Sequence, residues 1–520
     1  MEFQPNKHIQ QAGLAHVGRL FKSRAEAVPE RIAVTDLQRS LTYTALNQRV
    51  NRLANHLCSD GILPGDRVAL LARNCIEYIE VELACAKIGA IVAAQNWRLA
   101  DRELAHCLNL VTPKIIIHEA ELTANLDRLD LLPHARLSFG EAYETALANA
   151  STAEPDIQID DEAGLIILYT SGTTGLPKGA LISHRAMVAR SFAYAVDLGV
   201  PADNNFVAWP PLFHMVSTDH ALSTLMRGGR VIVVDGFQAD RLITCLQRYQ
   251  MHWFIVIPGM IEGFLAALKD ADPVIKGVAM IGAMADLVPP QQLAAITTAL
   301  NAPYLNSFGA TETGLPPATG NLIPINTAPS RLSKQQSAGC EIRLVDGDDN
   351  EVPLGTPGEL TLRGPTLFSG YWQAEQTNAD DFRGGWFHLG DVFRRNGDGS
   401  LDFVDRVKYM IKSGGENIYP AEIEQVILAD LRVADCAVIR QSDDRWGEVP
   451  IALVARQDPC LTAADLMQLC AAQLSRYKRP QAVIFIDQND FPRSTSGKIQ
   501  RHELEARMTA KKLNSQNKAT

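Results

Sequence analysis

The sequence lacks any close pair of cysteines of the kind that forms a metal-binding or redox motif. Its nine cysteines are scattered along the chain, and their odd number and wide spacing favour free thiols in a reducing compartment over a disulfide framework. No segment approaches the roughly 18 consecutive apolar residues that indicate a transmembrane helix. Residues 1–13 are polar and have no apolar stretch typical of a signal peptide. We therefore expect a cytoplasmic protein without integral membrane association.

The chain also lacks an excess of positive charge. Its formal net charge is -10 and its isoelectric point is near 5.7, which argues against a nucleic-acid partner because phosphate backbones select clustered lysine and arginine. A substrate that carries phosphate must therefore be bound by a local group of residues. The 520 residues, 46% of them hydrophobic, can bury several cores and form a few domains.

Strand-like and helix-like segments alternate from the start of the chain, which predicts an α/β fold. The first expected strands are residues 32–35 and 68–71, and the first expected helices are residues 43–58 and 77–88. Residues 340–362 alternate apolar and polar side chains around turns, and this pattern predicts a small subdomain of antiparallel strands.

A domain boundary is expected after the turn-rich residues 396–399. We expect an N-terminal domain over residues 1–407 and a compact α+β domain over residues 408–520. The first helix of the second domain has an apolar stripe. It is predicted to bury Ile423 and to leave Glu424 in solvent.

A segment rich in glycine and hydroxyl side chains follows the apolar strand expected at residues 165–169. It reads Tyr169-Thr170-Ser171-Gly172-Thr173-Thr174-Gly175-Leu176-Pro177-Lys178-Gly179. Glycines let backbone N–H groups approach phosphate oxygens, hydroxyls add donors, and Lys178 adds a positive charge. Gly179 stands where a Walker A loop has Ser or Thr. The segment predicts a triphosphate-binding loop of another kind; the alternative is a polar surface turn.

Five further segments follow in order along the chain. They are Asn306-Ser307-Phe308-Gly309-Ala310-Thr311-Glu312, Gly385-Trp386-Phe387-His388-Leu389-Gly390-Asp391, Asp405-Arg406-Val407-Lys408, Lys412-Ser413-Gly414-Gly415-Glu416-Asn417-Ile418-Tyr419-Pro420 and Pro492-Arg493-Ser494-Thr495-Ser496-Gly497-Lys498. Together with the phosphate loop, they make the chain resemble the adenylate-forming (AMP-binding) superfamily. This superfamily comprises acyl-CoA synthetases, luciferases and the adenylation domains of peptide synthetases.

The resemblance implies a large N-terminal adenylate-forming domain of several subdomains and a small, mobile α+β C-terminal domain. It also implies the activity of an ATP-dependent carboxylic acid:CoA ligase. Such an enzyme forms acyl-AMP and pyrophosphate, and then acyl-CoA and AMP. Its ligands would be ATP, Mg²⁺, a small carboxylic acid and coenzyme A.

The resemblance assigns roles to individual residues. Those expected to bind ATP are Thr170, Ser171, Gly172, Thr173, Thr174, Lys178, Gly282, Ala283, Asn306, Asp391 and Arg406. The carboxylate of Asp391 suits the ribose hydroxyls because it only accepts hydrogen bonds, and the amide of Asn306 can read the adenine edge. Glu312 and Thr170 would hold Mg²⁺. Thr311 would meet the α-phosphate, and Gly414 and Gly415 would line the path of CoA.

Lys498 is expected to drive the first step. Attack of a carboxylate on the α-phosphate builds negative charge, and an ammonium group placed there stabilises the transition state more than the ground state. Lys498, His214, Thr311 and Glu312 are therefore the candidate catalytic residues. The chain departs from the family pattern at Leu389, where Thr is common, and at Met284, where a small residue is frequent. Neither departure removes a reacting group.

The acyl group is expected beside Trp209-Pro210-Pro211-Leu212-Phe213-His214, which resembles the family's aromatic/histidine gate. We expect His214 to act as a steric gate. The resemblance places the walls of the acyl site at Met215, Asp219, Ile257, Pro258, Met284, Gly309 and Gly314. Most of these are apolar, which fits an uncharged acyl body. Asp219 would disfavour a second carboxylate or attract an amine, unless it points elsewhere.

Other functions are weighed against this one. The alternative kept open is an adenylating enzyme that loads the thiol of a carrier protein instead of free CoA. A luciferase would need a pocket shape that the sequence does not reveal. A silent nucleotide-binding protein is disfavoured because Lys178, Glu312, Asp391, Arg406 and Lys498 are all present. The acid itself and the choice between a monomer and a homodimer stay open.

Overall fold

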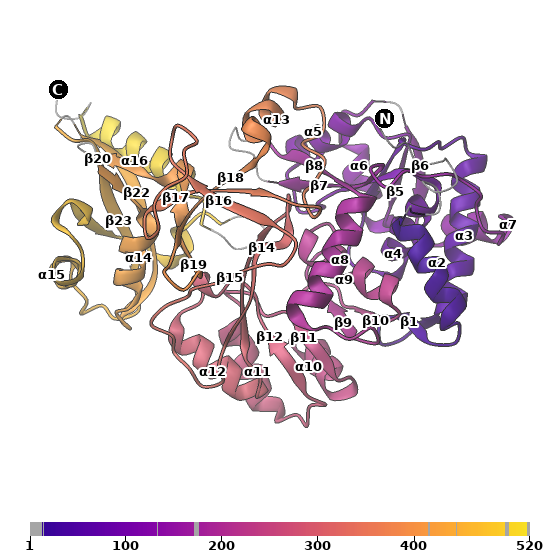
Figure 1. Cartoon of the computed structure of the whole chain (residues 1–520), viewed down its shortest axis with the longest axis horizontal. Coiled ribbons are helices and arrows are strands. Elements are labelled where there is room, and N and C mark those ends of the chain that lie inside the picture. The colour runs from indigo at the N-terminus through magenta and orange to yellow at the C-terminus, as the bar shows by residue number, and fades with distance from the viewer. Residues whose placement is uncertain are drawn as a thin grey trace, which may run out of the picture.

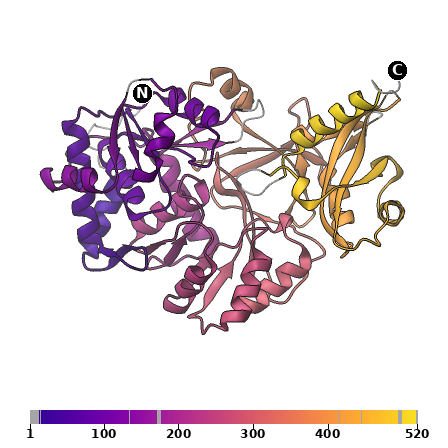
Figure 2. The same cartoon turned by 180° about the vertical axis from the view of Figure 1, so that it is seen from behind.

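The computed structural model describes residues 13, 15–132, 134–170, 176–413, 416–443, 445–493 and 499–516, with residues 287 and 509–516 described by their backbone alone. The N-terminal and C-terminal regions lie at opposite ends of the longest axis (Figures 1 and 2). Within the described residues, no helix is long and apolar enough to cross a membrane.

A six-stranded sheet in the order β6-β5-β3-β4-β7-β8 organises the N-terminal region. Its strands are β3 (Arg67–Leu71), β4 (Ile91–Ala94), β5 (Ile115–His118), β6 (Ala135–Ser138), β7 (Gly164–Thr170) and β8 (Lys178–Ser183). All neighbours are parallel apart from β7 and β8. In β3, Val68 and Leu70 face one apolar core while Ala69 and Leu71 face another. The sheet is therefore buried on both faces, as parallel sheets are.

A second sheet has the order β2-β1-β10-β9. Its strands are β1 (Ile32–Thr35), β2 (Ser40–Thr42), β9 (Asn205–Ala208) and β10 (Arg230–Val233). The helices packed between the two sheets are α3 (Tyr43–Ser59), α4 (Ile76–Ile88), α8 (His184–Leu198) and α9 (Met215–Arg227). Every residue of α4 except Glu77 is buried. Further helices of this region are α2 (Val17–Ala27), α5 (Asp101–Val111), α6 (Thr123–Asp127) and α7 (Glu141–Asn149). The strands and helices predicted from the first hundred residues are confirmed to within about one residue at most ends.

A third sheet has the order β11-β12-β13-β14-β15. Its strands are β11 (Met251–Phe254), β12 (Val278–Ile281), β13 (Tyr304–Ala310), β14 (Gly314–Ile323) and β15 (Gln335–Gln336), and it is accompanied by α10 (Ala239–Arg248), α11 (Ile261–Ala271) and α12 (Pro290–Leu300). Strands β13 and β14 are antiparallel. Their short connection carries Thr311 and Glu312, so both residues lie at one end of this sheet.

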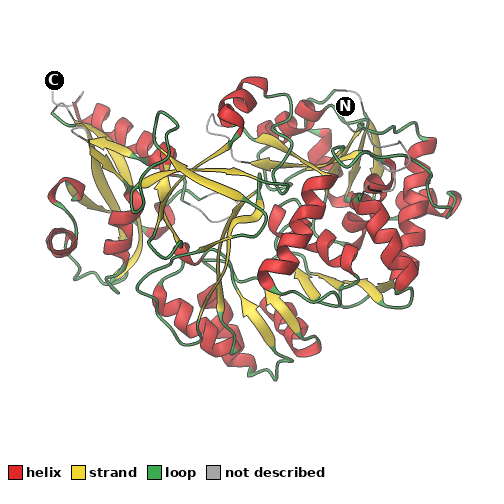
Figure 3. Ribbon diagram, viewed as in Figure 1, coloured by secondary structure: helices red, strands yellow, loops and turns green. Residues whose placement is uncertain are grey.

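A four-stranded antiparallel sheet follows, in the order β16-β17-β18-β19. Its strands are β16 (Glu341–Val345), β17 (Pro357–Arg363), β18 (Phe387–Arg395) and β19 (Leu401–Arg406), with α13 (Glu375–Asp381) between β17 and β18. Figure 3 shows that helices crowd around the N-terminal sheets, whereas long strands dominate here. The predicted β-rich subdomain is confirmed.

The C-terminal region has hydrophobic cores of its own. Its strands are β20 (Ile411–Ser413), β21 (Glu416–Ile418), β22 (Val433–Asp443), β23 (Gly447–Arg456) and β24 (Ala482–Phe485), and its helices are α14 (Pro420–Leu428), α15 (Ala463–Gln473) and α16 (Arg501–Gln516). They form a mixed sheet with helices packed on it. Such an arrangement is an α+β unit.

The prediction that Glu424 stays in solvent is wrong. Ile423 is buried as expected, but Glu424 is also buried, at 9% exposure. The Glu424 carboxylate accepts the backbone N–H of Val438 at 2.6 Å and pairs with Arg501. Helix α14 packs against β22 with this side chain in the contact, and the partners offset the cost of removing the carboxylate from water.

Of the ion pairs between described residues, the most deeply buried joins Arg190 on α8 to Asp219 on α9, with Nη1 and Oδ2 3.0 Å apart. The two side chains are 2% and 3% exposed. Arg190 also donates from Nε to the carbonyl of Thr366 and from Nη2 to the carbonyl of Thr311, both at 3.0 Å. Burial raises the pKa of Asp219 although Arg190 opposes this shift. One guanidinium group thus ties together two helices and two loops.

We expect Arg190→Met to destabilise the N-terminal region by about 3–5 kcal/mol, because it leaves the Asp219 carboxylate buried and unpaired. The measurement is the midpoint of thermal unfolding, followed by circular dichroism. Arg128→Met is the matched control, since Arg128 pairs with Asp101 where both side chains are 55% exposed and such a pair contributes at most about 1 kcal/mol. Equal midpoints for the two variants would contradict the structural role of Arg190.

Candidate active site

The predicted phosphate loop joins two antiparallel strands. Thr170 at the end of β7 pairs in register with Lys178 at the start of β8, so both residues lie at the mouth of the loop. Ser171, Gly172, Thr173 and Thr174 lie outside the described residues, and their binding role stays a prediction.

The far edge of β8 is paired with a second segment, residues 369–372. The N–H of Ser369 donates to the carbonyl of Leu181 at 2.7 Å, and the N–H of Trp372 donates to the carbonyl of Gly179 at 2.7 Å. These bonds hold the intervening Tyr371 opposite Ala180 of β8. Two segments separated by nearly two hundred residues therefore meet beside the phosphate loop.

Tyr371 connects Lys178 to Glu312. The Lys178 ammonium lies 4.0 Å from the centre of the Tyr371 ring, a distance at which a cation is attracted to the aromatic face. The Tyr371 hydroxyl donates to Glu312 Oε1 at 2.7 Å. Burial, with the Glu312 charge as the next cause, raises the pKa of Tyr371. The phenol therefore stays neutral and remains a donor to the carboxylate.

The backbone of the Thr311–Glu312 connection is held from several sides. Arg190 binds the Thr311 carbonyl, as described above, and the N–H of Phe368 donates to the Glu312 carbonyl at 2.9 Å. The N–H of Ala310 donates to the hydroxyl of Thr313 at 3.0 Å. These bonds fix the main chain of two predicted catalytic residues before any ligand binds.

Asp391 and Arg406 face each other on neighbouring strands β18 and β19. Arg406 Nε donates to Asp391 Oδ1 at 3.0 Å, and the Asp391 side chain is 4% exposed. The Asp391 charge is the main cause of the raised pKa of Arg406, with smaller contributions that include the charge of Glu312. Two predicted ATP-binding residues are therefore in contact, and the charge of Glu312 contributes to the raised pKa of one of them, Arg406.

Gly282 and Ala283 form a turn packed against two aromatic side chains. Trp253 Nε1 donates to the Gly282 carbonyl at 2.8 Å, and the Tyr304 hydroxyl donates to the Ala283 carbonyl at 3.1 Å. Gly282 has φ +77, and a Cβ atom there would lie 2.1 Å from the Tyr304 ring. A glycine is required at this position by both conformation and space.

Asn306 is fully buried on β13. Its Nδ2 donates to the carbonyls of Leu332 at 2.9 Å and Ser333 at 3.2 Å. Its Oδ1 has no partner among the described residues. The donors that were expected to read adenine are therefore engaged by the chain, and the adenine contact stays a prediction.

His214 is exposed and caps the start of α9, where its Nδ1 accepts the N–H of Val216 at 3.3 Å. The preceding segment is held by Asn74, whose Nδ2 donates to the Pro210 carbonyl and whose Oδ1 accepts the N–H of Leu212, both at 2.8 Å. This fixes the entry into α9, while the gate itself stays a prediction. Asp219, a predicted wall of the acyl site, points instead at Arg190.

Three further predicted residues, Gly414, Gly415 and Lys498, also lie outside the described part of the chain. Arg190, Asn74 and Tyr371 were missed by sequence reasoning. For Tyr371, the only signal in the sequence was its place directly after Gly370. The contacts of Arg190 and Asn74 are with residues far away in the sequence, and no local pattern indicates them.

The residues present fit a nucleoside triphosphate with a divalent cation. Lys178 and Arg406 supply positive charge, and Glu312 supplies a hard carboxylate oxygen next to them. Among the residues that the structure describes, no group of three or more His, Cys, Asp or Glu side chains could hold a metal by itself. A cation at Glu312 would thus share its coordination with phosphate oxygens, which is the usual arrangement for Mg²⁺.

Comparisons with known proteins agree with this geometry. The family model described as AMP-binding enzyme matches residues 21–372, and that of the AMP-binding enzyme C-terminal domain matches residues 422–498. The chain is 32% identical to an indoleacetate–CoA ligase of Aromatoleum aromaticum over 489 residues, which cover 92% of this chain and 95% of the relative. It is 33% identical to a feruloyl-CoA synthase of an Amycolatopsis species, with coverage of 93% and 97%. The crystal structure of ATP-bound MatB from Rhodopseudomonas palustris superposes with a TM-score of 0.83 at 25% identity and covers 95% of this chain and 99% of that one.

We expect Tyr371→Phe to weaken binding of ATP in the presence of Mg²⁺ about tenfold, because Glu312 loses a hydrogen bond worth about 1.5–3 kcal/mol as a charged acceptor. The ring below Lys178 is kept, so the loss reports on the hydroxyl alone. Isothermal titration with and without Mg²⁺ measures it, and the loss should be larger with the cation.

Tyr249→Phe is the matched control, since the ring of Tyr249 contacts Arg230 away from this site. Wild-type affinity in Tyr371→Phe would show that Glu312 is positioned without the phenol.

Proposed function

This chain belongs to the AMP-binding enzyme family, and we propose that the acid it activates is an aromatic monocarboxylic acid with an uncharged body. The chain is an ATP-dependent acid:CoA ligase, which forms an acyl-adenylate and pyrophosphate and then acyl-CoA and AMP. Its relatives are named as CoA ligases or synthetases, which favours free CoA over the thiol of a carrier protein.

The observation that carries the proposed acid class is the Arg190–Asp219 pair. Asp219 is a charged residue among the predicted walls of the acyl site, and its carboxylate is neutralised by the 3.0 Å contact with Arg190. The guanidinium in turn donates from Nε and both Nη atoms to protein oxygens. Arg190 is therefore not left to bind a second carboxylate on the acyl group, and the Asp219 charge is compensated, while Asp219 Oδ1 has no hydrogen-bond partner among the described residues.

The names of two relatives point the same way. The two relatives described above are named for indoleacetate and for the feruloyl group, and both acids combine one carboxylate with an aromatic ring. A site whose side chains are mainly apolar or internally paired favours such acids, because burial of their rings releases water from apolar surface.

The first half-reaction places specific demands on the residues. We infer that Lys178 and Arg406 bind phosphate oxygens, that Asp391 accepts the ribose hydroxyls, and that Tyr371 holds Glu312 toward a Mg²⁺ ion. When bound, Mg²⁺ would neutralise charge on the phosphates and on the pyrophosphate leaving group. The acid attacks the α-phosphorus, and Thr311 and Lys498 stabilise the charge that develops there.

The second half-reaction needs a different arrangement of the same site. We propose that residues 408–520 turn relative to residues 1–407, so that Lys498 withdraws and Gly414 and Gly415 reach the path of CoA. At the boundary, the Asp405 carboxylate accepts the N–H groups of Arg406 and Ala421, both at 2.7 Å. The bond from Ala421 crosses the proposed boundary and would hold one of the two orientations. The unpaired cysteines among the described residues fit a cytoplasmic location for this reaction.

We expect indoleacetate and ferulate to be activated with a kcat/KM at least about a hundredfold above that for malonate, because a second carboxylate would be buried without a partner. The assay is pyrophosphate release, run with and without CoA. Preference for malonate would overturn the proposed acid class, and activity that does not depend on CoA for turnover would revive the carrier-protein alternative.

We expect Lys498→Ala to lower the rate of adenylate formation by about a hundredfold or more, since loss of one preorganised donor costs about 3 kcal/mol. Thioester formation from supplied acyl-adenylate should continue. Single-turnover assays of each half-reaction separate the two effects. Lys269→Ala, at an exposed position on α11, is the control. Equal loss in both half-reactions would remove Lys498 from its proposed role.

A further inference from the structure

The strand that carries Asp391 has a bulge between His388 and Val392, which includes that residue. In the pairing of β17 with β18, Thr361 lies opposite His388 and Glu359 lies opposite Val392. A step of two residues on β17 therefore corresponds to a step of four on β18. Gly390, inside the bulge, has φ +76, a conformation that glycine adopts at little cost. Bulges of this kind redirect the side chains next to them.

At this bulge the Glu359 side chain accepts a hydrogen bond from the backbone of β18. The N–H of Gly390 donates to Glu359 Oε1 at 3.2 Å. The Glu359 side chain is 17% exposed, so this bond is largely protected from competition with water. Because Asp391 follows Gly390 directly, the bond fixes the main chain from which the Asp391 carboxylate projects.

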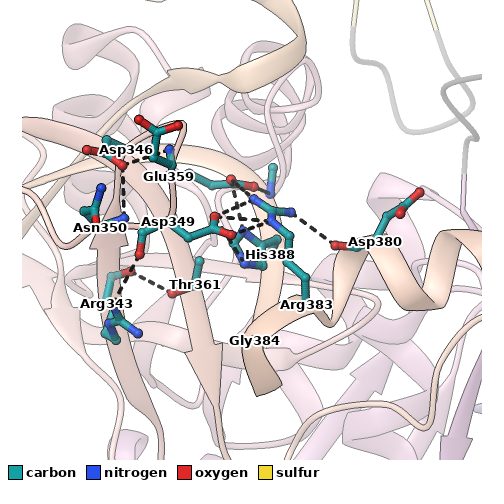
Figure 4. Close-up of polar contacts among 12 residues, drawn as sticks. Arg343, Asp346, Asp349, Asn350, Glu359, Thr361, Asp380, Arg383, Gly384 and His388 are labelled. Carbon is teal, nitrogen blue, oxygen red and sulfur yellow. Dashed lines mark hydrogen bonds and ion pairs between the residues drawn. The ribbon is translucent and has the colours of Figure 1, made fainter.

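The other carboxylate oxygen of Glu359 is held by two donors (Figure 4). His388 Nδ1 lies 3.1 Å from Oε2, and Arg383 Nη2 lies 3.4 Å from the same atom. Arg383 also pairs with Asp349 at 2.9 Å and donates from Nη1 to the Asp380 carbonyl at 3.1 Å. Figure 4 shows the Arg383 guanidinium joined to Asp349 and Glu359 on one side and to Asp380 on the other. The orientation of Glu359 is therefore set by two residues of β18 and by Arg383, which is itself held by Asp349 and Asp380.

We propose that Glu359 is a positioning residue for ribose recognition by Asp391. Glu359 holds the backbone at Gly390, while Arg406 contacts the Asp391 carboxylate from the neighbouring strand. The inference rests on the proposed contact between Asp391 and the ribose hydroxyls. A carboxylate aimed at two adjacent hydroxyls must be placed closely, and a shift of its main chain weakens both hydrogen bonds together.

The test compares ATP with 2′,3′-dideoxyadenosine 5′-triphosphate, which lacks both ribose hydroxyls. We expect Glu359→Ala to weaken binding of ATP about tenfold and to leave binding of the dideoxy nucleotide unchanged, because the lost positioning matters only to the hydroxyls. Glu359→Gln should show a smaller loss with the same selectivity, since its amide oxygen can still accept the Gly390 N–H. Isothermal titration with Mg²⁺ present measures the affinity of the wild type and of both variants for each nucleotide, and circular dichroism checks folding.

Asp349→Ala is the matched control. It removes a partner of Arg383 but no contact with Gly390, so its ATP affinity should change less than about threefold. Asp391→Ala should lose ATP affinity selectively, and Glu359→Ala combined with Asp391→Ala should be no weaker than Asp391→Ala alone.

The outcomes separate the two levels of the proposal. If Asp391→Ala binds both nucleotides as the wild type does, the ribose role of Asp391 is wrong and the role of Glu359 falls with it. If Asp391→Ala is selective but both Glu359 variants lose the two nucleotides equally, Glu359 has a general structural role and only its positioning role is overturned. Where Glu359→Ala does not fold, the selectivity of Glu359→Gln decides the question.

Discussion

The buried guanidinium group of Arg190 is the contact on which the arrangement of this site depends. It joins α8, which follows strand β8 and the predicted phosphate loop, to α9, which begins after His214. It also binds the carbonyls of Thr311 and Thr366. A charge buried to this extent is stable only if each of its donors finds an acceptor. The elements that bring those acceptors are therefore fixed relative to one another, and with them the residues predicted to bind phosphate, the acyl group and the metal.

Charges of both signs are paired around the site although the chain as a whole is acidic. Lys178 and Glu312 meet through Tyr371, and Arg406 meets Asp391 on the neighbouring strand. Each group is held by a protein partner, so little reorganisation is needed when a nucleotide binds. Preorganised charge is more effective than charge gathered on binding. This arrangement explains how a protein with net negative charge can bind a triphosphate.

The sequence alone was sufficient for the regular elements, including the two strands that flank the predicted phosphate loop. Strands such as 32–35 and helices such as 43–58 are confirmed because their apolar periodicity is a local property of the chain. The β-rich subdomain was predicted for the same reason. The order of the motifs was sufficient for the family, which the comparisons confirm.

Only the tertiary structure decided which side chains act together. Glu424 was predicted in solvent from its place on an amphipathic helix, yet Arg501, far along the chain, makes its burial possible. Tyr371 reaches Glu312, and Glu359 reaches Gly390, across strand pairings that no local pattern specifies. The sequence left open whether Asp219 faces the acyl group, and the structure pairs it with Arg190. The physical reason is the same in each case: periodicity determines which face of an element is buried, but the partner of a buried polar group depends on which distant segment is packed against it.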